Sequence, residues 1–446
     1  CGAADAGSAF KMAVGAAVGG ICGISTAVAP SGVHAPAPAR AAAAAAAAAA
    51  CGERDRRKVT CLQGGGVVGR GGGGACRPRR RRRRRRGSGR HRAGHEAVDR
   101  LGRGRPVDAE VTAAGEREGA LEVQRVVGEE ALHRGARAVD VVTFEFENIP
   151  FESASRLTDW VAVRPDPSVL HTAQHRAREK TFLRDSGFPV VPFALIRSVA
   201  EVDAAVRAIG VPSVLKTAGF GYDGKGQHKI TSAEQVAAIV SASDQEWVLE
   251  QWQDFEKEIS VGIARGVDRK MADWGAVENR HAHHILDVSV VPAAIAEETE
   301  REAVRLARAI AEKLGLVGLL WIEFFVAKDG SVRINEMAPR PHNSGHWTIE
   351  GASCSQFENH IRAVAGLPLG STEVVRPTVM INIIGQHPKS EDVLALNGAH
   401  LHLYNKTERE GRKIGHITLM PNDSAELTTL CRQLAKILPE PLALTQ

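Results

Sequence analysis

The 446-residue sequence lacks any uncharged apolar run of eighteen or more residues, so no membrane span is predicted. The alanine run from Ala41 to Ala50 is too short and too weakly apolar to be one. There is also no Cys-x-x-Cys pair to suggest a zinc site. After residue 76 the only cysteines are Cys354 and Cys431, which is typical of a reduced, intracellular compartment. We therefore expect a cytoplasmic protein.

Positive charge is concentrated at the N-terminus. Up to Arg105 the chain has 21 Lys and Arg against 5 Asp and Glu, a net charge of +16. The remaining chain has 36 basic and 47 acidic residues, a net charge of −11. The acidic remainder gives no reason to expect a nucleic-acid partner.

Residues 1–106 differ in composition from everything that follows. They combine an Ala- and Gly-rich leader, the alanine run and eight consecutive arginines, Arg79 to Arg86. Such a segment cannot bury enough apolar surface to offset its ordering entropy. We predict a low-complexity segment that is either disordered or mistranslated, with a nucleic-acid-binding tail as the functional alternative. The Ala-rich leader is also similar to a plastid transit peptide, and the first residue, Cys1, suggests a missing N-terminus.

From about residue 120, apolar periodicity predicts alternating strands and helices, so we expect an α/β (α+β) chain. Hairpins outnumber simple crossovers, which disfavours a plain doubly wound sheet. The expected parts are a remnant N-terminal α/β domain at 107–165, a central domain at 166–368 and a small β-rich domain at 369–446. The fragment "VTCLQGGGVVGR", Val59 to Arg70, is a candidate first strand and turn of a nucleotide-binding-like domain.

The stretch "KTAGFGYDGKGQ", Lys216 to Gln227, suggests a phosphate-binding loop. Its lysine precedes the glycines and the glycines lead into a strand, so it matches neither a P-loop nor a dinucleotide fingerprint. Upstream, Lys180 lies on a predicted helix, and both lysines could also be ordinary surface residues. The stretch "VLEQWQDFEKEIS" places Glu250 and Glu258 around the end of a strand, where an adenine edge and a ribose could be bound.

A predicted hairpin, "GLLWIEFFVAKDGSVRINEM", carries two carboxylates. With Asp329-Gly330 as its turn, Glu323 and Glu336 fall opposite each other. With Asn335 they form an oxygen-ligand set suited to Mg²⁺, unless both are simply solvated on an exposed face. The next stretch, "APRPHNSGHW", contains Arg340, His342 and Asn343 as donors for an anion. A metal pair followed by an anion-binding loop indicates phosphoryl chemistry.

Taken in order, these elements resemble the ATP-grasp enzymes, and within them the N5-carboxyaminoimidazole ribonucleotide synthetase family. The match covers about residues 138–420 and includes "DVVTFEFENIP", "KTAGFGYDGKGQ", "EQWQDFEKEIS", "NEMAPRPHNSGHWT" and "GAHLHLYNKTEREGRKIGH". The resemblance implies an ATP-grasp fold at 166–368, with a poorly preserved nucleotide-binding-like domain before it. It also implies Mg²⁺-dependent carboxylation of 5-aminoimidazole ribonucleotide by ATP and bicarbonate, through carboxyphosphate, in de novo purine (IMP) biosynthesis.

The resemblance also implies roles for individual residues. The implied ATP contacts are Lys180, Lys216, Gly221, Gly224, Gln227, Glu250, Gln251, Trp252, Glu258 and Asn335, and the implied metal ligands are Glu323 and Glu336. The residues implied at the reacting groups are Arg340, His342, Asn343, Tyr222 and Asp223. Those implied at the ribonucleotide are Glu147, Lys406, Arg412 and Lys413. The cluster His281, His283 and His284 falls in a hairpin that the resemblance puts away from the chemistry, so we expect it at the surface.

The chain departs from the family between Arg70 and about Gly128, where an arginine run replaces the expected first helix. "KMADWGAVENRH" is also off-pattern. The resemblance implies a homodimer, and a fused or partner mutase domain that would follow the final "LPEPLALTQ". Two alternatives remain: a non-catalytic ATP-binding relative with an RNA-binding tail, and an ATP-grasp ligase for another carboxylate.

Overall fold

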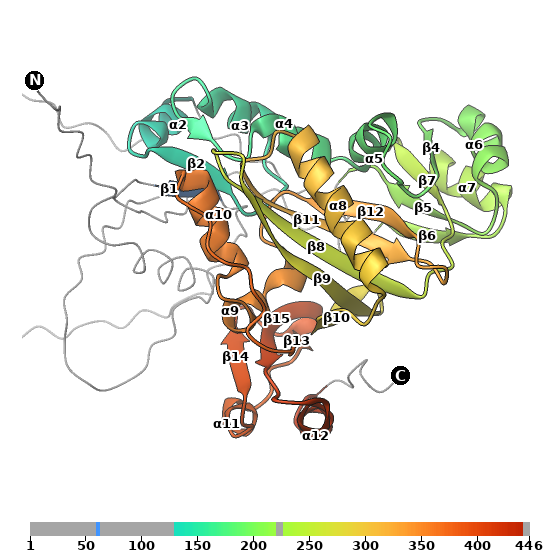
Figure 1. Ribbon diagram of the computed structural model, residues 1–446. Coiled ribbons are helices and arrows are strands. Elements are labelled where there is room, and N and C mark those ends of the chain that lie inside the picture. Colours follow the sequence, from blue (N-terminus) through green and yellow to red (C-terminus); the bar gives the residue numbers. More distant parts are fainter. Residues whose placement is uncertain (1–58, 63–128, 220–225, 440–446) are drawn as a thin grey trace, which may run out of the picture. The chain divides into compact units, whose positions relative to one another are not determined.

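The computed structural model describes residues 59–62, 129–219 and 226–439 (Figure 1). These residues belong to one compact unit. Several sequence-based predictions lie outside the described residues: those for the alanine and arginine runs, the glycine turn after residue 62, and Gly221, Tyr222, Asp223 and Gly224. Within the described ranges, no helix is both long enough and apolar enough to cross a membrane.

A small parallel sheet forms the first part of the fold. Its strands are β1 (Val59–Leu62), β2 (Val141–Phe144) and β3 (Ala162–Val163), in that order. All four residues of β2 are buried, as expected for the central strand of a parallel sheet. The predicted strand at the start of "VTCLQGGGVVGR" is confirmed, because Val59 pairs in register with Val141. Helices α2 (Glu129–Ala136) and α3 (Phe151–Leu157) accompany this sheet.

A four-stranded antiparallel sheet follows, in the order β4-β7-β5-β6. Its strands are β4 (Phe193–Ile196), β5 (Ser213–Thr217), β6 (Gln227–Ile230) and β7 (Trp247–Gln251). The associated helices are α4 (Pro167–Ala173), α5 (Arg176–Asp185), η1 (Val199–Glu201), α6 (Val202–Ile209) and α7 (Ala233–Ser241). Apolar residues of α6 and α7, such as Val202 and Val236, pack against Leu215 and Leu249 of the sheet. One face of this sheet is therefore covered by helices.

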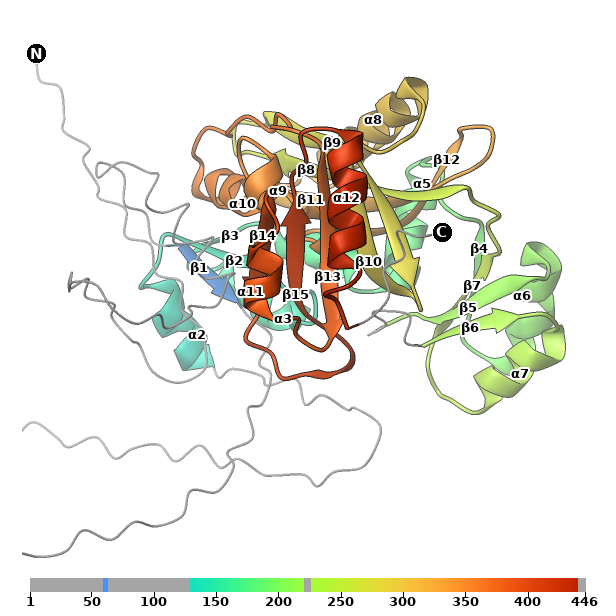
Figure 2. The ribbon, with the colours of Figure 1, turned by 90° about the horizontal axis from the view of Figure 1, so that it is seen from below.

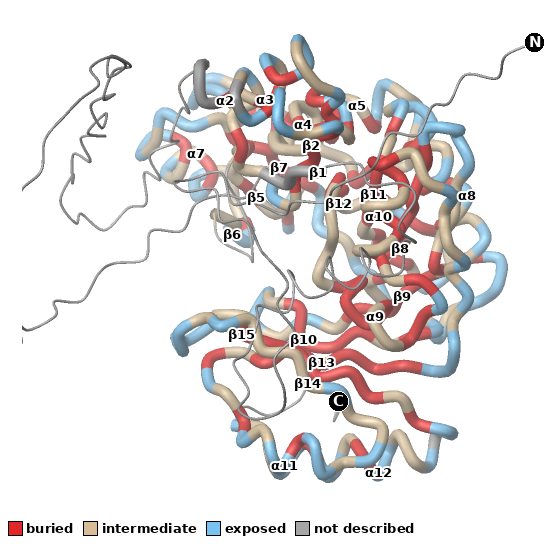
Figure 3. The backbone as a smooth tube through the Cα atoms, turned by 90° about the vertical axis from the view of Figure 1, so that its left-hand side faces the viewer, coloured by how far each residue is buried: buried red, intermediate tan, exposed pale blue. Residues whose placement is uncertain are grey.

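The largest sheet has eight strands in the order β12-β11-β8-β9-β10-β13-β15-β14. Their bounds are β8 (Lys257–Arg265), β9 (Met271–Ala282), β10 (Ile285–Val291), β11 (Gly318–Val326), β12 (Val332–Ala338), β13 (Thr378–Gly385), β14 (Ala399–Leu403) and β15 (Arg409–Leu419). Because β10 pairs with β13, the β-rich segment 369–446 extends the sheet of the preceding segment and does not form a separate sheet. The shared strands β10 and β13 consist mostly of buried residues (Figure 3).

Helices cover this sheet at several places. Helix α8 (Glu297–Lys313) lies across β8, β9 and β11 and buries Leu306 and Ile310 against Ile322 (Figure 1). Helix α12 (Ser424–Leu434) runs alongside β13 and β15 (Figure 2), where Leu430 and Leu434 are buried. The remaining elements are η2 (Asn343–Gly345), α9 (Thr348–Gly351), α10 (Gln356–Ala365) and α11 (Ser390–Leu394).

Trp321 of β11 packs between two glycines, Gly262 of β8 and Gly345 in the segment that follows β12. The Trp321 side chain is fully buried, and the residue pairs with Gly262 on the neighbouring strand β8. A Cβ atom added at Gly345 would lie 2.2 Å from the Trp321 ring and 2.8 Å from the Gln356 side chain. Real Cβ atoms do not approach other atoms so closely, so only glycine lets the segment after β12 pack against this tryptophan.

We predict that Gly345→Ala lowers the free energy of unfolding by about 1 to 3 kcal/mol, because the extra methyl group overpacks this contact. The control is Gly135→Ala in α2, where an added Cβ would meet nothing within 4 Å. That change should leave stability unchanged or raise it by up to about 1 kcal/mol. Urea unfolding of both variants tests the difference, and equal stabilities would contradict the packing argument.

Candidate active site

A β-bulge in the β11–β12 hairpin brings Glu323, Asn335 and Glu336 to the same face of the hairpin. Glu323 pairs with Glu336 as predicted, but the next pair is Phe324 with Ile334, so Asn335 is an extra residue on β12. Consecutive residues of a regular strand point to opposite faces, and the bulge removes that alternation here. Asn335 Oδ1 consequently lies 3.4 Å from Lys216 Nζ, while Glu336 Oε2 lies 3.5 Å from Arg176 Nη2.

Glu250 is a buried carboxylate surrounded by cations. Its oxygens lie 2.8 Å from Lys216 Nζ, 3.2 Å from Lys180 Nζ and 3.9 Å from Arg176 Nε. Lys180 also donates a hydrogen bond of 3.0 Å to the main-chain oxygen of Asn335. The predicted lysines therefore do lie together, and they are joined to the hairpin as well as to β7.

The electrostatics of this cluster follow from its burial. Burial opposes the ionised form of Glu250, but the charges of Lys180 and Lys216 lower its pKa to about 2. Burial lowers the pKa of Lys180, and Glu250 acts against that effect. Because the Glu250 carboxylate is paired with the two lysines, only the main chain of Glu250 is left to contact an adenine.

The segment after β12 holds its polar side chains in place through hydrogen bonds. Gln356 accepts a bond from the His342 amide at 2.9 Å and donates one to the His342 carbonyl at 2.8 Å. The amides of Asn343 and Asn382 bond each other reciprocally, at 3.0 and 2.7 Å. Arg340 lies 3.1 Å from Glu147, the predicted ribonucleotide residue. Burial raises the pKa of Glu147, and Arg340 acts against this shift.

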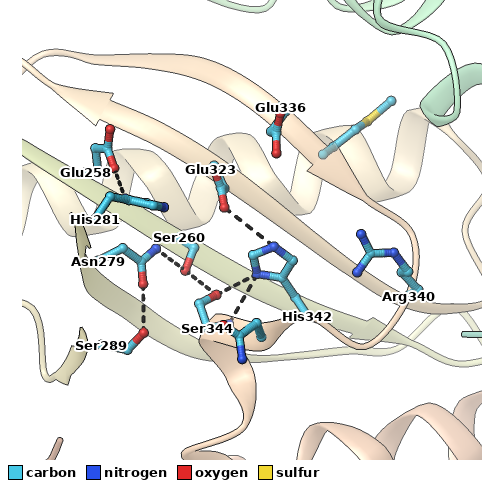
Figure 4. Close-up of polar contacts among 12 residues, drawn as sticks. Glu258, Ser260, Asn279, His281, Ser289, Glu323, Glu336, Arg340, His342 and Ser344 are labelled. Carbon is cyan, nitrogen blue, oxygen red and sulfur yellow. Dashed lines mark hydrogen bonds and ion pairs between the residues drawn. The ribbon is translucent and has the colours of Figure 1, made fainter. Parts of the chain in front are cut away.

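Glu323 and His342 face each other, with His342 Nε2 3.5 Å from Glu323 Oε1 (Figure 4). Burial raises the pKa of Glu323 to about 7, and the neighbouring Glu336 adds to this effect. Burial lowers the pKa of His342 well below its ordinary value, and the charges of Arg340 and Lys413 act in the same direction. At neutral pH the imidazole is therefore uncharged.

His281 is exposed, as expected, but it does not lie away from the predicted site residues. Its Nδ1 forms an ion pair with Glu258, and its side chain is 25% exposed. Burial lowers the pKa of His281, but the bond to Glu258 and the charge of Glu323 raise it above the ordinary value. His281 is the last residue but one of β9, beside the carboxylate predicted to bind ribose. His283 and His284 are exposed in the following turn, as predicted.

The remaining predicted residues lie in two further places. Gln227 begins β6 opposite Lys216, while the exposed Trp252 follows β7 and is covered by Lys229, whose Nζ lies 4.4 Å from the ring. Gln251 ends β7 and is exposed. In the C-terminal strands, Lys406 donates to the Lys413 carbonyl at 3.3 Å and Arg412 donates to Thr407 Oγ1 at 2.7 Å. Lys413 is near enough to affect the titration of Glu323 and His342.

Sequence reasoning missed three residues that contact this site. Arg176 lies one helical turn before Lys180, so their spacing of four residues was a usable signal. Glu179 is buried and accepts a hydrogen bond from the Met337 amide, next to Glu336, and burial raises its pKa to about 8. Asn382 had no sequence signal, because its pairing with Asn343 depends on how β13 joins the sheet.

We predict that Glu250→Gln lowers the free energy of unfolding by about 3 to 5 kcal/mol at pH 7, because it leaves buried lysine charges without a partner. The pKa of Glu250 is below its ordinary value of 4.5, so its ionised form stabilises the native state above pH 4.5. That contribution is lost as the pH falls from 4.5 towards 2. Urea unfolding between pH 3 and 7 should show the two proteins converging in acid.

The control is Glu302→Gln, which removes an exposed carboxylate 2.7 Å from Arg305 on α8. An exposed pair of this kind contributes at most about 1 kcal/mol. Equal losses for the two variants would show that Glu250 is no more important than a surface carboxylate.

Three known family models and several characterised proteins match this chain in sequence. Residues 108–174 match the ribonucleotide synthetase preATP-grasp domain, residues 181–357 the ATP-grasp domain and residues 378–429 the phosphoribosylaminoimidazole carboxylase C-terminal domain. The N5-carboxyaminoimidazole ribonucleotide synthase of Bacillus subtilis is 40% identical over 303 residues, covering 67% of this chain and 79% of that protein. A bifunctional purine synthesis protein of Dictyostelium discoideum is 43% identical over 313 residues, but the match covers 65% of this chain and 31% of that protein.

Solved structures agree with these matches. The N5-carboxyaminoimidazole ribonucleotide synthetase of Thermus thermophilus has a TM-score of 0.66 at 40% identity, covering 70% of this chain and 85% of that one. The Aspergillus clavatus enzyme in complex with ADP and 5-aminoimidazole ribonucleotide has a TM-score of 0.64 at 29% identity, covering 69% and 84%. The predicted ATP-grasp fold is thereby confirmed. The chain belongs to the N5-carboxyaminoimidazole ribonucleotide synthase family of ATP-grasp enzymes.

Proposed function

We propose that this chain uses ATP and bicarbonate to carboxylate 5-aminoimidazole ribonucleotide, through carboxyphosphate, in de novo IMP biosynthesis. The products would be N5-carboxyaminoimidazole ribonucleotide, ADP and phosphate. The observation that carries the proposal is the meeting of Glu323 and Glu336 with His342 on one side and the Lys216–Glu250 cluster on the other. Phosphoryl transfer needs charge neutralisation and positioning, and such a set supplies both.

The ATP site is proposed along β5, β7 and β8. Lys216 would contact the phosphates, while the wholly buried Lys180 would hold Glu250 and the main chain of Asn335. The main chain from Glu250 to Trp252 would contact the adenine, and Glu258 would hold the ribose. Gly221, Gly224 and Gln227 would close the loop over the phosphates, although both glycines lie outside the described residues.

The hairpin residues fit a Mg²⁺ site in the chemistry of their donors. Glu323 and Glu336 offer two carboxylates on paired positions, and Mg²⁺ is commonly bound by one or two carboxylates together with substrate phosphates. Asn335 adds an amide oxygen beside Lys216. Within the described part of the chain, no cluster of three or more His, Cys, Asp or Glu side chains is arranged to hold a metal alone. When bound, Mg²⁺ would neutralise phosphate charge.

Arg340, His342 and Asn343 are proposed to hold bicarbonate and carboxyphosphate. Arg340 supplies a positive charge, while His342 and Asn343 supply directed donors fixed by Gln356 and Asn382. Donors fixed in advance need no reorganisation as charge develops on the transferred group. No protein nucleophile is needed, because ATP itself activates the bicarbonate.

The ribonucleotide is proposed to bind between the N-terminal and C-terminal segments. Lys406, Arg412 and Lys413 would hold its phosphate and Glu147 its ribose. Tyr222 and Asp223 are proposed to approach the aminoimidazole, although both lie outside the described residues. The contact of Glu147 with Arg340 supports this arrangement, since it brings the ribose residue to the anion-binding segment.

A homodimer, a fused or partner mutase domain, and a cytoplasmic or plastid location stay predictions. The bifunctional relative from Dictyostelium discoideum supports the fusion. Light scattering of the purified chain would test the dimer.

We predict that ADP release requires both 5-aminoimidazole ribonucleotide and bicarbonate, and that Glu336→Gln lowers kcat/KM on the order of 100-fold or more. The substitution keeps the shape of the side chain but removes the charge proposed to bind Mg²⁺. A coupled ADP assay with each substrate omitted in turn measures both effects.

The control is Glu312→Gln, which alters an exposed carboxylate of α8 and should leave kcat/KM within about twofold. ADP release that does not depend on the aminoimidazole would indicate a ligase for another acceptor. Turnover unaffected by Glu336→Gln would contradict the proposed metal site.

A further inference from the structure

Five buried or partly buried polar side chains form a continuous hydrogen-bonded chain that ends at His342 (Figure 4). It runs from Ser289 of β10 through Asn279 of β9 and Ser260 of β8 to Ser344 and His342. The successive distances are 3.0, 2.9, 2.8 and 2.8 Å. Ser260, Ser289 and Ser344 are fully buried and Asn279 is 4% exposed. In such a chain each hydroxyl donates to one neighbour and accepts from the other, so fixing the donor at one end fixes the donor of every bond.

The main-chain amide of Ser344 sets that direction at the His342 end. Its N–H donates to His342 Nδ1 at 3.4 Å, and a main-chain amide cannot exchange its roles. A proton on Nδ1 would point at this N–H and is therefore disfavoured. Nδ1 must accept, so the 2.8 Å contact with Ser344 Oγ requires the Ser344 hydroxyl to donate.

The remaining bonds follow step by step from this assignment. Because the Ser344 hydroxyl donates to His342, its oxygen accepts from the Ser260 hydroxyl. The Ser260 oxygen then accepts from the Asn279 amide nitrogen. Asn279 Oδ1 accepts from Ser289. Each donor and acceptor in the chain is used consistently, because the nitrogen of Asn279 donates to Ser260 and its oxygen accepts from Ser289, the last member.

The other ring nitrogen of His342 faces the proposed reaction centre. A neutral imidazole with an accepting Nδ1 carries its proton on Nε2. That N–H points toward Glu323 Oε1, 3.5 Å away. The charged or titratable groups that act on the ring are Arg340, Lys413, His281 and Glu323. The three basic groups among them oppose a second proton on the ring.

We propose that Ser344, Ser260 and Asn279 are positioning residues that hold His342 as its Nε2–H tautomer, so that His342 donates a hydrogen bond and does not act as a base through Nε2. The proposed recipient is the oxygen anion of bicarbonate or carboxyphosphate, and this part rests on the proposed function. The lone pair of Nε2 is occupied by its proton, so the proton released by the attacking amine goes elsewhere.

The tautomer itself is tested without any substrate. The full 446-residue chain is labelled with ¹⁵N-histidine, and the His342 signals are identified by their loss in His342→Gln. We expect a protonated Nε2 and an unprotonated Nδ1 at pH 7.5. A protonated Nδ1 would overturn the proposal even if the enzyme carries out the proposed reaction. A protein inactive on the proposed substrates that still shows the Nε2–H tautomer would leave the assignment intact and contradict only the function.

The role of the chain is tested by Ser344→Ala, which removes the shorter of the two donors to Nδ1. We expect kcat to fall about 10- to 100-fold, the usual effect of losing an orienting hydrogen bond, with the KM for ATP within about threefold. The ¹⁵N signals of His342 should show a fraction of the tautomer with its proton on Nδ1, because the hydroxyl that donates to Nδ1 is gone. A purely structural defect would not change the tautomer.

Asn279→Asp keeps the shape of the side chain but offers oxygens to both serines, so when ionised it should reverse the donation of Ser260 and favour a proton on Nδ1. The matched control is Ser213→Ala, which removes a buried hydroxyl without a hydrogen-bond partner and should leave the His342 signals and kcat unchanged. If Ser344→Ala and Asn279→Asp both fold, as judged by thermal unfolding with ADP, and both keep the wild-type tautomer, the chain does not position His342.

Discussion

The fold around the site depends on one buried carboxylate. Glu250 forms ion pairs with both Lys180 and Lys216, and through them β7 is joined to α5, to β5 and to the hairpin residue Asn335. The four-stranded sheet and the eight-stranded sheet thus meet over a set of charges, where a buried ion without its partner costs several kcal/mol. This requirement limits how the two sheets can be arranged, since a displacement of either would expose or separate the charges.

The anion-binding segment is held in a complementary way, by neutral hydrogen bonds and close packing. Gln356 fixes the His342 main chain, Asn382 fixes Asn343, and Gly345 allows contact with Trp321. These restraints come from α10, β13 and β11, so three separate elements determine the position of a few residues. Charges on one side and neutral bonds on the other together produce a site whose donors are oriented before any ligand binds.

Local patterns in the sequence predicted those features that are set by short-range geometry. Periodicity was enough for α8 and for the first strand. Glu323 lies opposite Glu336 as predicted, but the pairs from Val326–Val332 to Phe324–Ile334, continued regularly, would have placed Asn335 there. The bulge at Asn335 was not predictable, because either strand of a hairpin can accommodate an extra residue. The contact of His281 with Glu258 was not predicted, because it depends on the pairing of β8 with β9. Strand pairings between distant segments, such as β10 with β13, are set by tertiary packing.

The bulge in β12 also determines where the chain tolerates a change of length. Before the bulge, Val332 and Ile334 face the apolar core, and after it Met337 does, which leaves Asn335 and Glu336 on the side of the site. Deleting Asn335 would restore strict alternation with Glu336 still on the side of the site and Met337 still in the core, whereas deleting Ile334 would turn Asn335 towards the core. The turn between Val326 and Val332 lies outside both strands, so a change in its length does not alter which strand residues face the core. Natural insertions and deletions in this hairpin should therefore accumulate in the turn and avoid the residues from Val332 to Ile334, which precede the bulge.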